Sequence, residues 1–588
     1  MTDVPILWMS GARKEVMDLL RRIWREGDVE TRTALATMLV AGPPGHLLAH
    51  LDEDARRSSR DRRIFDRLTV LERLEDPPLD EVLLAEAARI RQAYPDWEAQ
   101  AGEQVDFSSW MEFRVGPDAD FTVDDLGTMQ VADLAALMTT TQDRRDGLLD
   151  RWRDFAAGAP DRALDVLNTL QNDPAVEDIW TYGLWGVRDH AAEPPFRGRV
   201  IDLLLDLPQP LMDQPRLANA AADILEAASK TRPLPADDPA FWRLFDGTLV
   251  AAAADVDNAD VPQDSGWVGL AINRSMGTLA TAFFGAMFGR GLKVGEGVPE
   301  DLRGLLDRLV SPGEPRHRPA RVIAASRLSY LYAVDPEWCQ EHLLPSFDWR
   351  DEAEALAAWQ GFAWQPRIDA KLWPALKPHF LPMFTAGRLR LLRESGRNMA
   401  AMLMLVGVEF GQSELPRDGV RDAIRAMPED LRSEAAAWIA TYLRQHADGQ
   451  PDDPQALSVD QAWSSHVSPW LRKVWPAEPE MNGRRVSAQF ARAAVAVDAA
   501  FPAALAVLSP FLSRGSSDIA LHDLQGSDHP TVHPRETIAL LEAIVDPNQV
   551  WFAAELREIL DRARAADPDL ANLNAYRTLD ERLRVDDR

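Results

Sequence analysis

Helical periodicity runs through this chain from end to end, and this feature restricts the fold more than any other. Apolar residues recur at spacings of three and four, which places them on one face of a helix. Such faces carry Val16, Leu19, Leu20, Ile23 and Trp24, then Leu79, Leu83, Ala87 and Ile90, and finally Phe552, Leu556, Ile559 and Leu560. Strict alternation of apolar and polar residues is almost absent. The sequence therefore predicts an all-α fold with few or no strands.

The length of the chain and its helix starts indicate how these helices are arranged. A chain of 588 residues is too long for one compact core, since single cores stop growing near ~250–300 residues. The pair Asp-Pro occurs at Asp76, Asp173, Asp238, Asp335, Asp453, Asp546 and Asp567. Aspartate is a good N-cap and proline a good first helical residue, so each pair predicts a helix start. The spacing is uneven, which favours an irregular HEAT-like α-solenoid of stacked helical hairpins.

Polar and Pro-rich stretches suggest a division near residues 311–319. A long apolar helix, predicted over 267–288, precedes this point. We expect an N-terminal helical array over 1–315 with an irregular insert near 105–123, where Phe, Trp, Gly and Asp are mixed. The second array, over 316–588, is rich in tryptophan.

Charge and cysteine content narrow the function classes. The formal net charge is −29, which argues against broad binding to nucleic acid or to an anionic membrane. Cys339 is the single cysteine, so an internal disulfide framework and a multi-cysteine zinc site are excluded. The longest uncharged stretch, 275–289, is shorter than the ~20 residues that span a bilayer. With no basic, apolar signal at the N-terminus, we expect a cytoplasmic protein without membrane contact.

Motifs for catalysis or cofactor binding are incomplete. Residues 40–46 begin like a nucleotide-binding loop, but His46-Leu47 stands where that motif needs Lys-Ser/Thr, which favours a turn between helices. Glycines 289, 291, 295 and 297 lack the dinucleotide-binding spacing and read as a helix end and a loop. We therefore predict no catalytic residues and no cofactor.

The densest group of possible metal ligands lies in segment 522–533. His522, His529 and His533 occur there with Asp523 and Asp528. Imidazole and carboxylate ligands suit zinc or a harder metal, so a metal-dependent hydrolase is one alternative function. The pairs His529-Pro530 and His533-Pro534 are equally typical of turns before a helix.

Two runs of arginine stand out against the acidic background. One is Arg56, Arg57, Arg60, Arg62, Arg63 and Arg67; the other is Arg388, Arg390, Arg393 and Arg397. Either run could contact phosphate, and a nucleic-acid-binding solenoid using Arg56–Arg67 is a second alternative. Helix faces paired with neighbouring acidic residues are the simpler interpretation.

The chain contains 19 tryptophans, and many are clustered in its second half. Tryptophan is enriched at interfaces because it buries a large area at low rotamer cost. Ordinary packing between helices is the other explanation. The residues proposed for partner binding are Trp349, Trp359, Trp364, Trp373, Arg388 and Arg390. Trp359 and Trp364 flank one ridge, on which we expect Trp359 in the core and Gly361 at a close backbone approach.

Several short stretches resemble a helical domain that follows sirtuin-like NADase domains in bacterial anti-phage defence proteins. They are residues 333–338 (AVDPEW), 347–349 (FDW) and 358–364 (AWQGFAW), with Ala271-Ile272-Asn273 and Gly277-Thr278-Leu279. The resemblance covers about Trp267 to Leu512 and implies a helical sensor or scaffold in a defence system. The chain departs from that pattern because it carries no sirtuin-like domain, so no catalytic residue is carried over. We expect a non-enzymatic helical protein that binds a protein partner, either an effector enzyme or a phage component.

Overall fold

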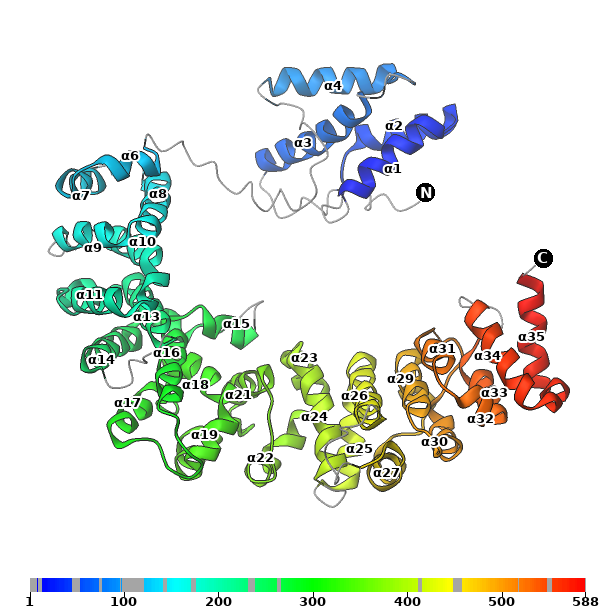
Figure 1. Ribbon diagram of the computed structural model, residues 1–588. Helices are drawn as coiled ribbons and strands as arrows, with labels where there is room; N and C mark the ends of the chain where they lie inside the picture. The colour runs from blue at the N-terminus through cyan, green and yellow to red at the C-terminus, as the bar shows by residue number, and fades with distance from the viewer. Residues whose placement is uncertain are drawn as a thin grey trace. The chain divides into compact units, whose positions relative to one another are not determined.

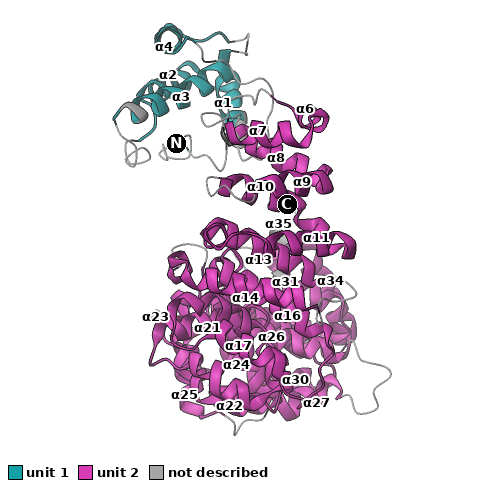
Figure 2. Ribbon diagram, turned by 90° about the vertical axis from the view of Figure 1, so that its left-hand side faces the viewer, with its two compact units in different colours: residues 1–118 teal, residues 119–588 magenta. Residues whose placement is uncertain are grey.

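Helices make up all the regular structure that the computed structural model describes (Figure 1). The described residues are 8, 13–44, 53–72, 74, 77–95, 97, 121–140, 145–170, 176–230, 238–261, 266–410, 415–447, 457–516, 518–546 and 553–586. These residues contain no strand, so the all-α prediction is confirmed. The chain divides into two compact units, residues 1–118 and 119–588, shown in teal and magenta in Figure 2.

Unit 1 contains four described helices around a core of its own. They are α1 (Arg13–Glu26), α2 (Val29–Ala41), α3 (Glu53–Glu72) and α4 (Glu81–Ala93). The periodic face predicted near the start lies on α1, where Leu20 and Trp24 are fully buried. Leu19 is 43% exposed, so it lies at the edge of that face. Gly42 ends α2 with a φ of 77°, which places a turn at the incomplete nucleotide motif, after a helix and not after a strand.

Unit 2 is a long series of helices. Its first half contains α6 (Val123–Thr128), α7 (Val131–Thr140), α8 (Arg145–Gly158), α9 (Pro160–Thr169), α10 (Glu177–Val187), α11 (Pro194–Leu205), α12 (Gln209–Met212), α13 (Pro215–Ser229), α14 (Pro239–Ala254), α15 (Gly266–Ile272), α16 (Ser275–Gly289), α17 (Glu300–Val310), α18 (Arg318–Ser326), α19 (Leu328–Val334) and α20 (Pro336–Trp338). Its second half contains α21 (Glu352–Trp364), α22 (Trp373–Phe380), α23 (Ala386–Leu392), α24 (Ser395–Glu409), α25 (Arg417–Ala426), α26 (Glu429–Ala447), α27 (Val459–Ala462), α28 (Ser468–Val474), α29 (Arg484–Val495), α30 (Phe501–Leu508), α31 (Asp518–Gln525), α32 (His529–Val532), α33 (Pro534–Ile544), α34 (Ala553–Ala566) and α35 (Asn574–Asp586).

These helices pack in rows, each against the next member of its row (Figure 1). One row runs α8, α10, α13, α16, α18, α21, α24, α26, α29, α31 and α34. Beside it run α7, α9, α11 and α14 at one end and α25, α28, α30, α33 and α35 at the other. One hydrophobic cluster extends along unit 2 from Leu126 to Leu583, because each hairpin buries its apolar face against its neighbours.

Polar bonds link neighbouring hairpins of unit 2. Arg188 pairs with Glu226 at 3.0 Å, and Arg327 Nη1 donates to Gln365 Oε1 at 2.8 Å. Bonds across the same separation of 38 residues join Arg199 to Asp161, Arg216 to Asp178, Ser329 to the Arg367 carbonyl, and the Asp498 amide to Asp460. Other bonds between hairpins join residues 31 to 36 apart, so the hairpins differ in length, as the uneven Asp-Pro spacing predicts.

The division expected near residues 311–319 falls inside unit 2, which begins at residue 119. Arg321, which is 1% exposed, donates to the carbonyls of Val310, Ser311 and Glu314. The same guanidinium pairs with Glu354 on α21. A buried side chain thus ties this polar, Pro-rich segment to the helices that follow it.

The helix expected over 267–288 is two helices, α15 and α16, with a corner between them. A Cβ on Gly277 would lie 2.0 Å from the Ala271 carbonyl oxygen, so glycine permits this tight approach. Asn273 Nδ2 donates to the Gly269 carbonyl at 2.7 Å, which satisfies an acceptor at the end of α15. The corner itself is formed by the polar residues Asn273 and Arg274, between two apolar helices.

Three of the Asp-Pro pairs cap helical turns as predicted. Asp238 accepts from the Ala240 amide at 2.9 Å, Asp335 from the Trp338 amide at 3.0 Å, and Asp567 from the Asp569 amide at 3.1 Å. The pairs at Asp76, Asp173 and Asp453 lie outside the described residues, as does most of the predicted insert near 105–123.

Candidate binding pocket

Three of the four tryptophans proposed for partner binding lie in the core. Trp359 is fully buried, and Trp373 and Trp349 are 2% and 8% exposed. Trp359 Nε1 donates to the Phe347 carbonyl at 3.2 Å, and Trp349 Nε1 to the His379 carbonyl at 3.0 Å. These three side chains pack helices together and do not face a partner in this structure. Trp364, at the end of α21, is 43% exposed.

The two arginines proposed with them differ in their surroundings. Arg388 stacks over Trp349 at 4.5 Å, pairs with Glu352 at 2.8 Å and donates to the Pro382 carbonyl at 2.6 Å. Its guanidinium therefore holds the start of α23 in place. Arg390, two residues further along α23, is exposed and lines a pocket. Arg390 and Trp364 are the two proposed residues that remain accessible.

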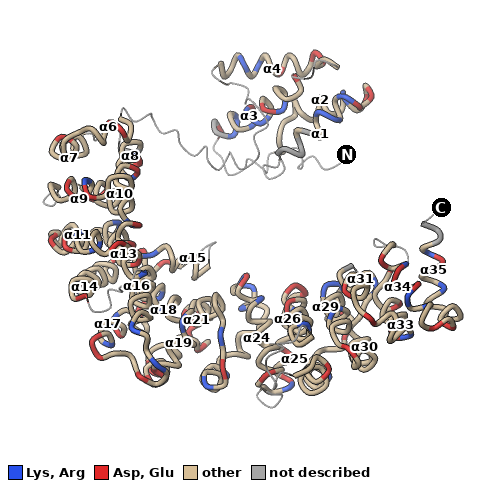
Figure 3. Tube along the Cα trace, viewed as in Figure 1, with Lys and Arg blue, Asp and Glu red and all other residues tan. Residues whose placement is uncertain are grey.

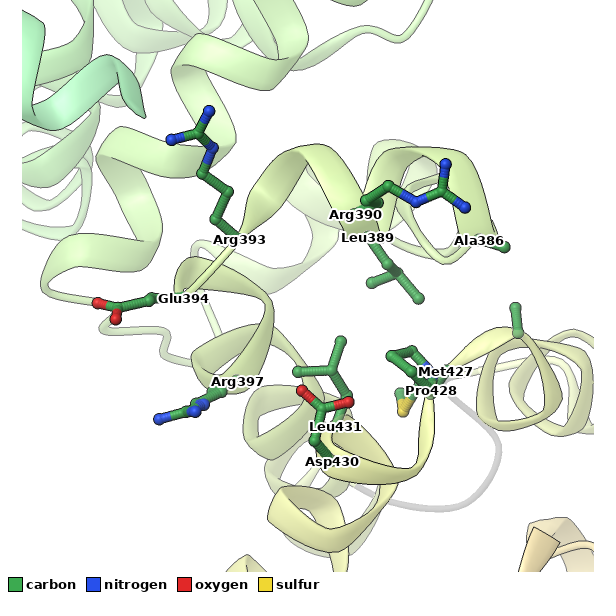
Figure 4. Close-up of a pocket in the computed structure, with 11 residues that line it drawn as sticks. Ala386, Leu389, Arg390, Arg393, Glu394, Arg397, Met427, Pro428, Asp430 and Leu431 are labelled. Carbon is green, nitrogen blue, oxygen red and sulfur yellow. The ribbon is translucent and has the colours of Figure 1, made fainter. Parts of the chain in front are cut away.

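The pocket lies between α23, the start of α24 and the corner that joins α25 to α26 (Figure 4). Its volume is about 670 Å³, within the usual range for ligand-binding pockets. Its lining is Ala386, Leu389, Arg390, Arg393, Glu394, Arg397, Ala426, Met427, Pro428, Asp430 and Leu431. The arginine run in the sequence indicated one wall. The other wall was missed, because nothing local in residues 426–431 shows that they lie opposite α23.

The middle of the pocket is apolar and its edges are charged (Figure 4). Leu389, Met427 and Leu431 are 3%, 1% and 4% exposed, so they form a firm floor. Arg390, Arg393 and Arg397 are exposed, as are Glu394 and Asp430. Figure 3 shows both signs of charge along unit 2, with arginine prominent at α23.

Buried polar bonds hold the two walls of the pocket. Arg432, 7% exposed, donates to the Met427 carbonyl and, at 3.1 Å, to the Met481 carbonyl. Burial lowers the pKa of Arg432. On the other wall, Gln360 Nε2 donates to the Leu391 carbonyl at 2.8 Å, and its Oε1 accepts from the Trp267 amide at 2.7 Å. The pocket is therefore preformed.

Arg393 lies in a strained backbone conformation at the edge of the pocket. Its φ is 53°, well inside the positive region that residues other than glycine rarely adopt. Such strain costs on the order of 1–3 kcal/mol and is concentrated at functional sites. Here it makes the sharp turn between α23 and α24, which brings Arg390 and Arg397 to the same pocket.

The metal site kept as an alternative in segment 522–533 is not formed among the described residues. His529 stacks on Phe501 with ring centroids 4.2 Å apart, and its Nε2 lies 2.9 Å from the Val495 carbonyl. Burial lowers the pKa of His529, so the neutral ring is favoured. No group of three possible ligands that could hold a metal ion occurs in the described part of the chain. The histidine is used for packing between α29, α30 and α32.

The arginine run of α3 is used within unit 1. Arg60 Nη2 donates to the Val40 carbonyl at 2.8 Å, and Arg63 Nη1 to the Trp8 carbonyl at 3.3 Å. Arg67 is 5% exposed and stacks over Trp8 at 4.4 Å, while Arg62 pairs with Asp66 at 3.3 Å. These contacts stabilise the unit and give no support to a phosphate-binding strip at Arg56–Arg67.

Comparison with known proteins gives a distant relative and no family. No family model matches the chain. The uncharacterized protein y4cA of Sinorhizobium fredii is similar at 24% identity over 560 residues. The match covers 91% of this chain and 44% of that protein, so the chain spans less than half the length of its relative. In the described part of the chain, no helix combines the length and apolar character needed to cross a membrane.

Proposed function

We propose that this chain is a non-enzymatic helical scaffold or sensor that binds a protein partner in the cytoplasm. The observation that carries the proposal is the preformed pocket between α23 and α26, where exposed arginines surround an apolar floor. Long helical arrays bind partners on surfaces of this kind, made by neighbouring hairpins. The resemblance of residues 267–512 to helical regions of defence proteins favours a role in bacterial anti-phage defence.

The proposal is tested by filling the pocket. Ala386 lines the pocket and is exposed at the start of α23, so Ala386→Trp adds bulk there without disturbing the core. Tagged chain is purified from its native host, with and without phage, after cross-linking. We expect a stoichiometric protein cross-linked to residues 386–431, lost with Ala386→Trp. Arg472→Glu, on the exposed face of α28, is the control and should retain the partner.

Two outcomes would overturn the proposal. One is a chain that purifies alone in both infected and uninfected cells. The other is a partner that Ala386→Trp retains in full, since binding would then use another surface. The defence role is tested separately. The chain and its neighbouring genes are placed in a phage-sensitive bacterium, where plaque number should fall with the wild-type chain and recover with Ala386→Trp.

A further inference from the structure

The directions of the arginines at the pocket limit what it can bind. In Figure 4 the side chains of Arg390, Arg393 and Arg397 point away from one another and do not converge on one point. A single phosphate group is usually held by donors that converge on its oxygens. Guanidinium groups that lie apart at the edges of a pocket are instead suited to a ligand whose negative groups also lie apart.

The apolar floor between these arginines favours a ligand that carries an apolar group. Leu389, Met427, Pro428 and Leu431 lie together in the middle of the pocket. Leu389, Met427 and Leu431 are almost fully buried, and Pro428 is the exposed residue among the four. An apolar side chain of a ligand that packs on Pro428 is removed from water, whereas a ligand that is charged throughout offers no such group.

The local charge is opposite in sign to that of the whole chain. Three arginines against Glu394 and Asp430 leave one net positive charge at the pocket, whereas the chain as a whole carries −29. An acidic ligand is therefore repelled by most of the surface and accepted here, which gives specificity as well as attraction.

Two further apolar side chains are exposed on α21 and α23. Leu391 is 54% exposed and follows Arg390 on α23. Trp364 is 43% exposed at the end of α21, and Asn398 donates to the Ala363 carbonyl at 2.7 Å, which brings the start of α24 against that end.

We infer that the pocket binds a short acidic peptide segment of the partner, with one bulky apolar side chain on the floor. Carboxylates of the segment pair with Arg390 and Arg397, which have no ion-pair partner among the described residues. Glu394 and Asp430 accept hydrogen bonds from backbone amides of the segment. The inference rests on the proposed function, since it names the chemistry of the partner at the same pocket.

The test uses labelled peptides and fluorescence anisotropy with the full chain. The probe is a fluorescein-labelled peptide of alternating Asp and Glu around a central Phe. One matched peptide carries Asn and Gln in place of the acids, and another carries Ala in place of Phe. We expect each matched peptide to bind at least about tenfold more weakly, since two ion pairs or one buried ring contribute roughly 1.4 kcal/mol or more.

Variants locate the binding. The double variant Arg390→Glu, Arg397→Glu should lower the affinity for the acidic peptide by about tenfold or more. It should have little effect on the affinity for the amide peptide. Ala386→Trp should abolish binding of both. Arg472→Glu is again the control and should bind as the wild type does. Raising the salt concentration from about 50 to about 500 mM should lower the affinity for the acidic peptide and not for the amide peptide, because salt screens exposed ion pairs.

The outcomes separate this inference from the proposed function. Equal affinity for the acidic and the amide peptides would overturn the inference that the ligand is acidic. The proposed function would still stand if Ala386→Trp abolished binding of the native partner. If inorganic phosphate or single-stranded DNA displaced the acidic peptide and bound at least as tightly, the ligand would be a phosphate compound and the inference would fail. Binding that depends on both acids and Phe, and on Arg390 and Arg397, supports it.

Discussion

At the scale of single residues, burial decides what a tryptophan does. Trp359 is fully buried and its ring contacts Phe347, Phe362 and Phe380 at centroid distances of 5.0, 5.9 and 5.9 Å. Trp359→Ala should therefore lower the stability of unit 2 by about 3–5 kcal/mol. Trp364→Ala is the matched control, because that ring is 43% exposed. Thermal melting followed by circular dichroism compares them, and equal melting temperatures would contradict the assignment.

A buried ion cluster makes stability sensitive to one carboxylate. Glu354 pairs with Arg318 at 2.8 Å and with Arg321 at 2.5 Å, and both arginines are buried. Glu354→Gln would leave two buried cations without their counter-ion. We expect a loss of about 3–5 kcal/mol, measured by urea unfolding at neutral pH. Glu352→Gln, on the exposed side of α21, should cost less than about 1 kcal/mol.

The same ion cluster predicts that the stability of the folded state depends on pH. Burial alone would raise the pKa of Glu354, but hydrogen bonds and charge from Arg321 and Arg318 outweigh it and lower the pKa below 4.5. The ionised group therefore stabilises the folded state above pH 4.5, and this contribution is lost as the pH falls through the lowered pKa. The stability gap between wild type and Glu354→Gln should narrow under acid conditions. A gap that stays constant as the pH falls below 4.5 would show that Glu354 does not titrate with folding.

At the scale of helical elements, one close approach depends on a missing side chain. A Cβ on Gly361 would lie 2.2 Å from the Val322 carbonyl oxygen, so α21 packs directly on the backbone of α18. Gly361→Ala must push these helices apart, and we expect a loss of about 1–3 kcal/mol. Gly304→Ala, inside α17 with open space around it, should be neutral or stabilise by about 0.5–1 kcal/mol. Melting temperatures that shift in the same direction would contradict this reasoning.

Helices and their caps are the part of the fold that the sequence predicts well. Asp238 and Asp335 act through neighbours two or three residues away, so a local pattern is enough to find them. The break between α15 and α16 was missed because it depends on how closely Gly277 approaches the Ala271 carbonyl, which apolar periodicity does not record. The segment near 311–319 has the composition of a break, yet Arg321 on the next helix bonds to its carbonyls, and composition does not record such contacts.

The pocket was predictable only in part, for a similar reason. Arg390 and Trp364 were identified from residue type; both are exposed, and Arg390 lines the pocket. Trp349 and Trp373 have the same residue type and are buried, because neighbouring helices cover them. Residue type shows what a side chain can contact, whereas its exposure depends on which helices pack across it.

At the scale of the whole molecule, contacts between neighbouring hairpins recur although the residues that make them differ. Arg188 bonds to Glu226, Arg327 to Gln365, and Asp498 to Asp460, each across 38 residues, yet the residue types differ each time. A search for identical residues does not detect these contacts. The contact between one hairpin and the next recurs along unit 2. We therefore expect the stability of each hairpin to depend mainly on the hairpins that pack against it.

Nearest-neighbour stability predicts that a core defect at one end of unit 2 stays local. Leu556 on α34 and Trp152 on α8 are both fully buried, near opposite ends of the row. Leu556→Ala should raise amide hydrogen exchange in residues 518–586 and leave 145–230 unchanged, while Trp152→Ala should do the reverse, because many packed helices of the row lie between the two ends. Hydrogen exchange followed by mass spectrometry measures both regions in each variant. Equal loss of protection at both ends would show that unit 2 unfolds as one cooperative body and would contradict this prediction.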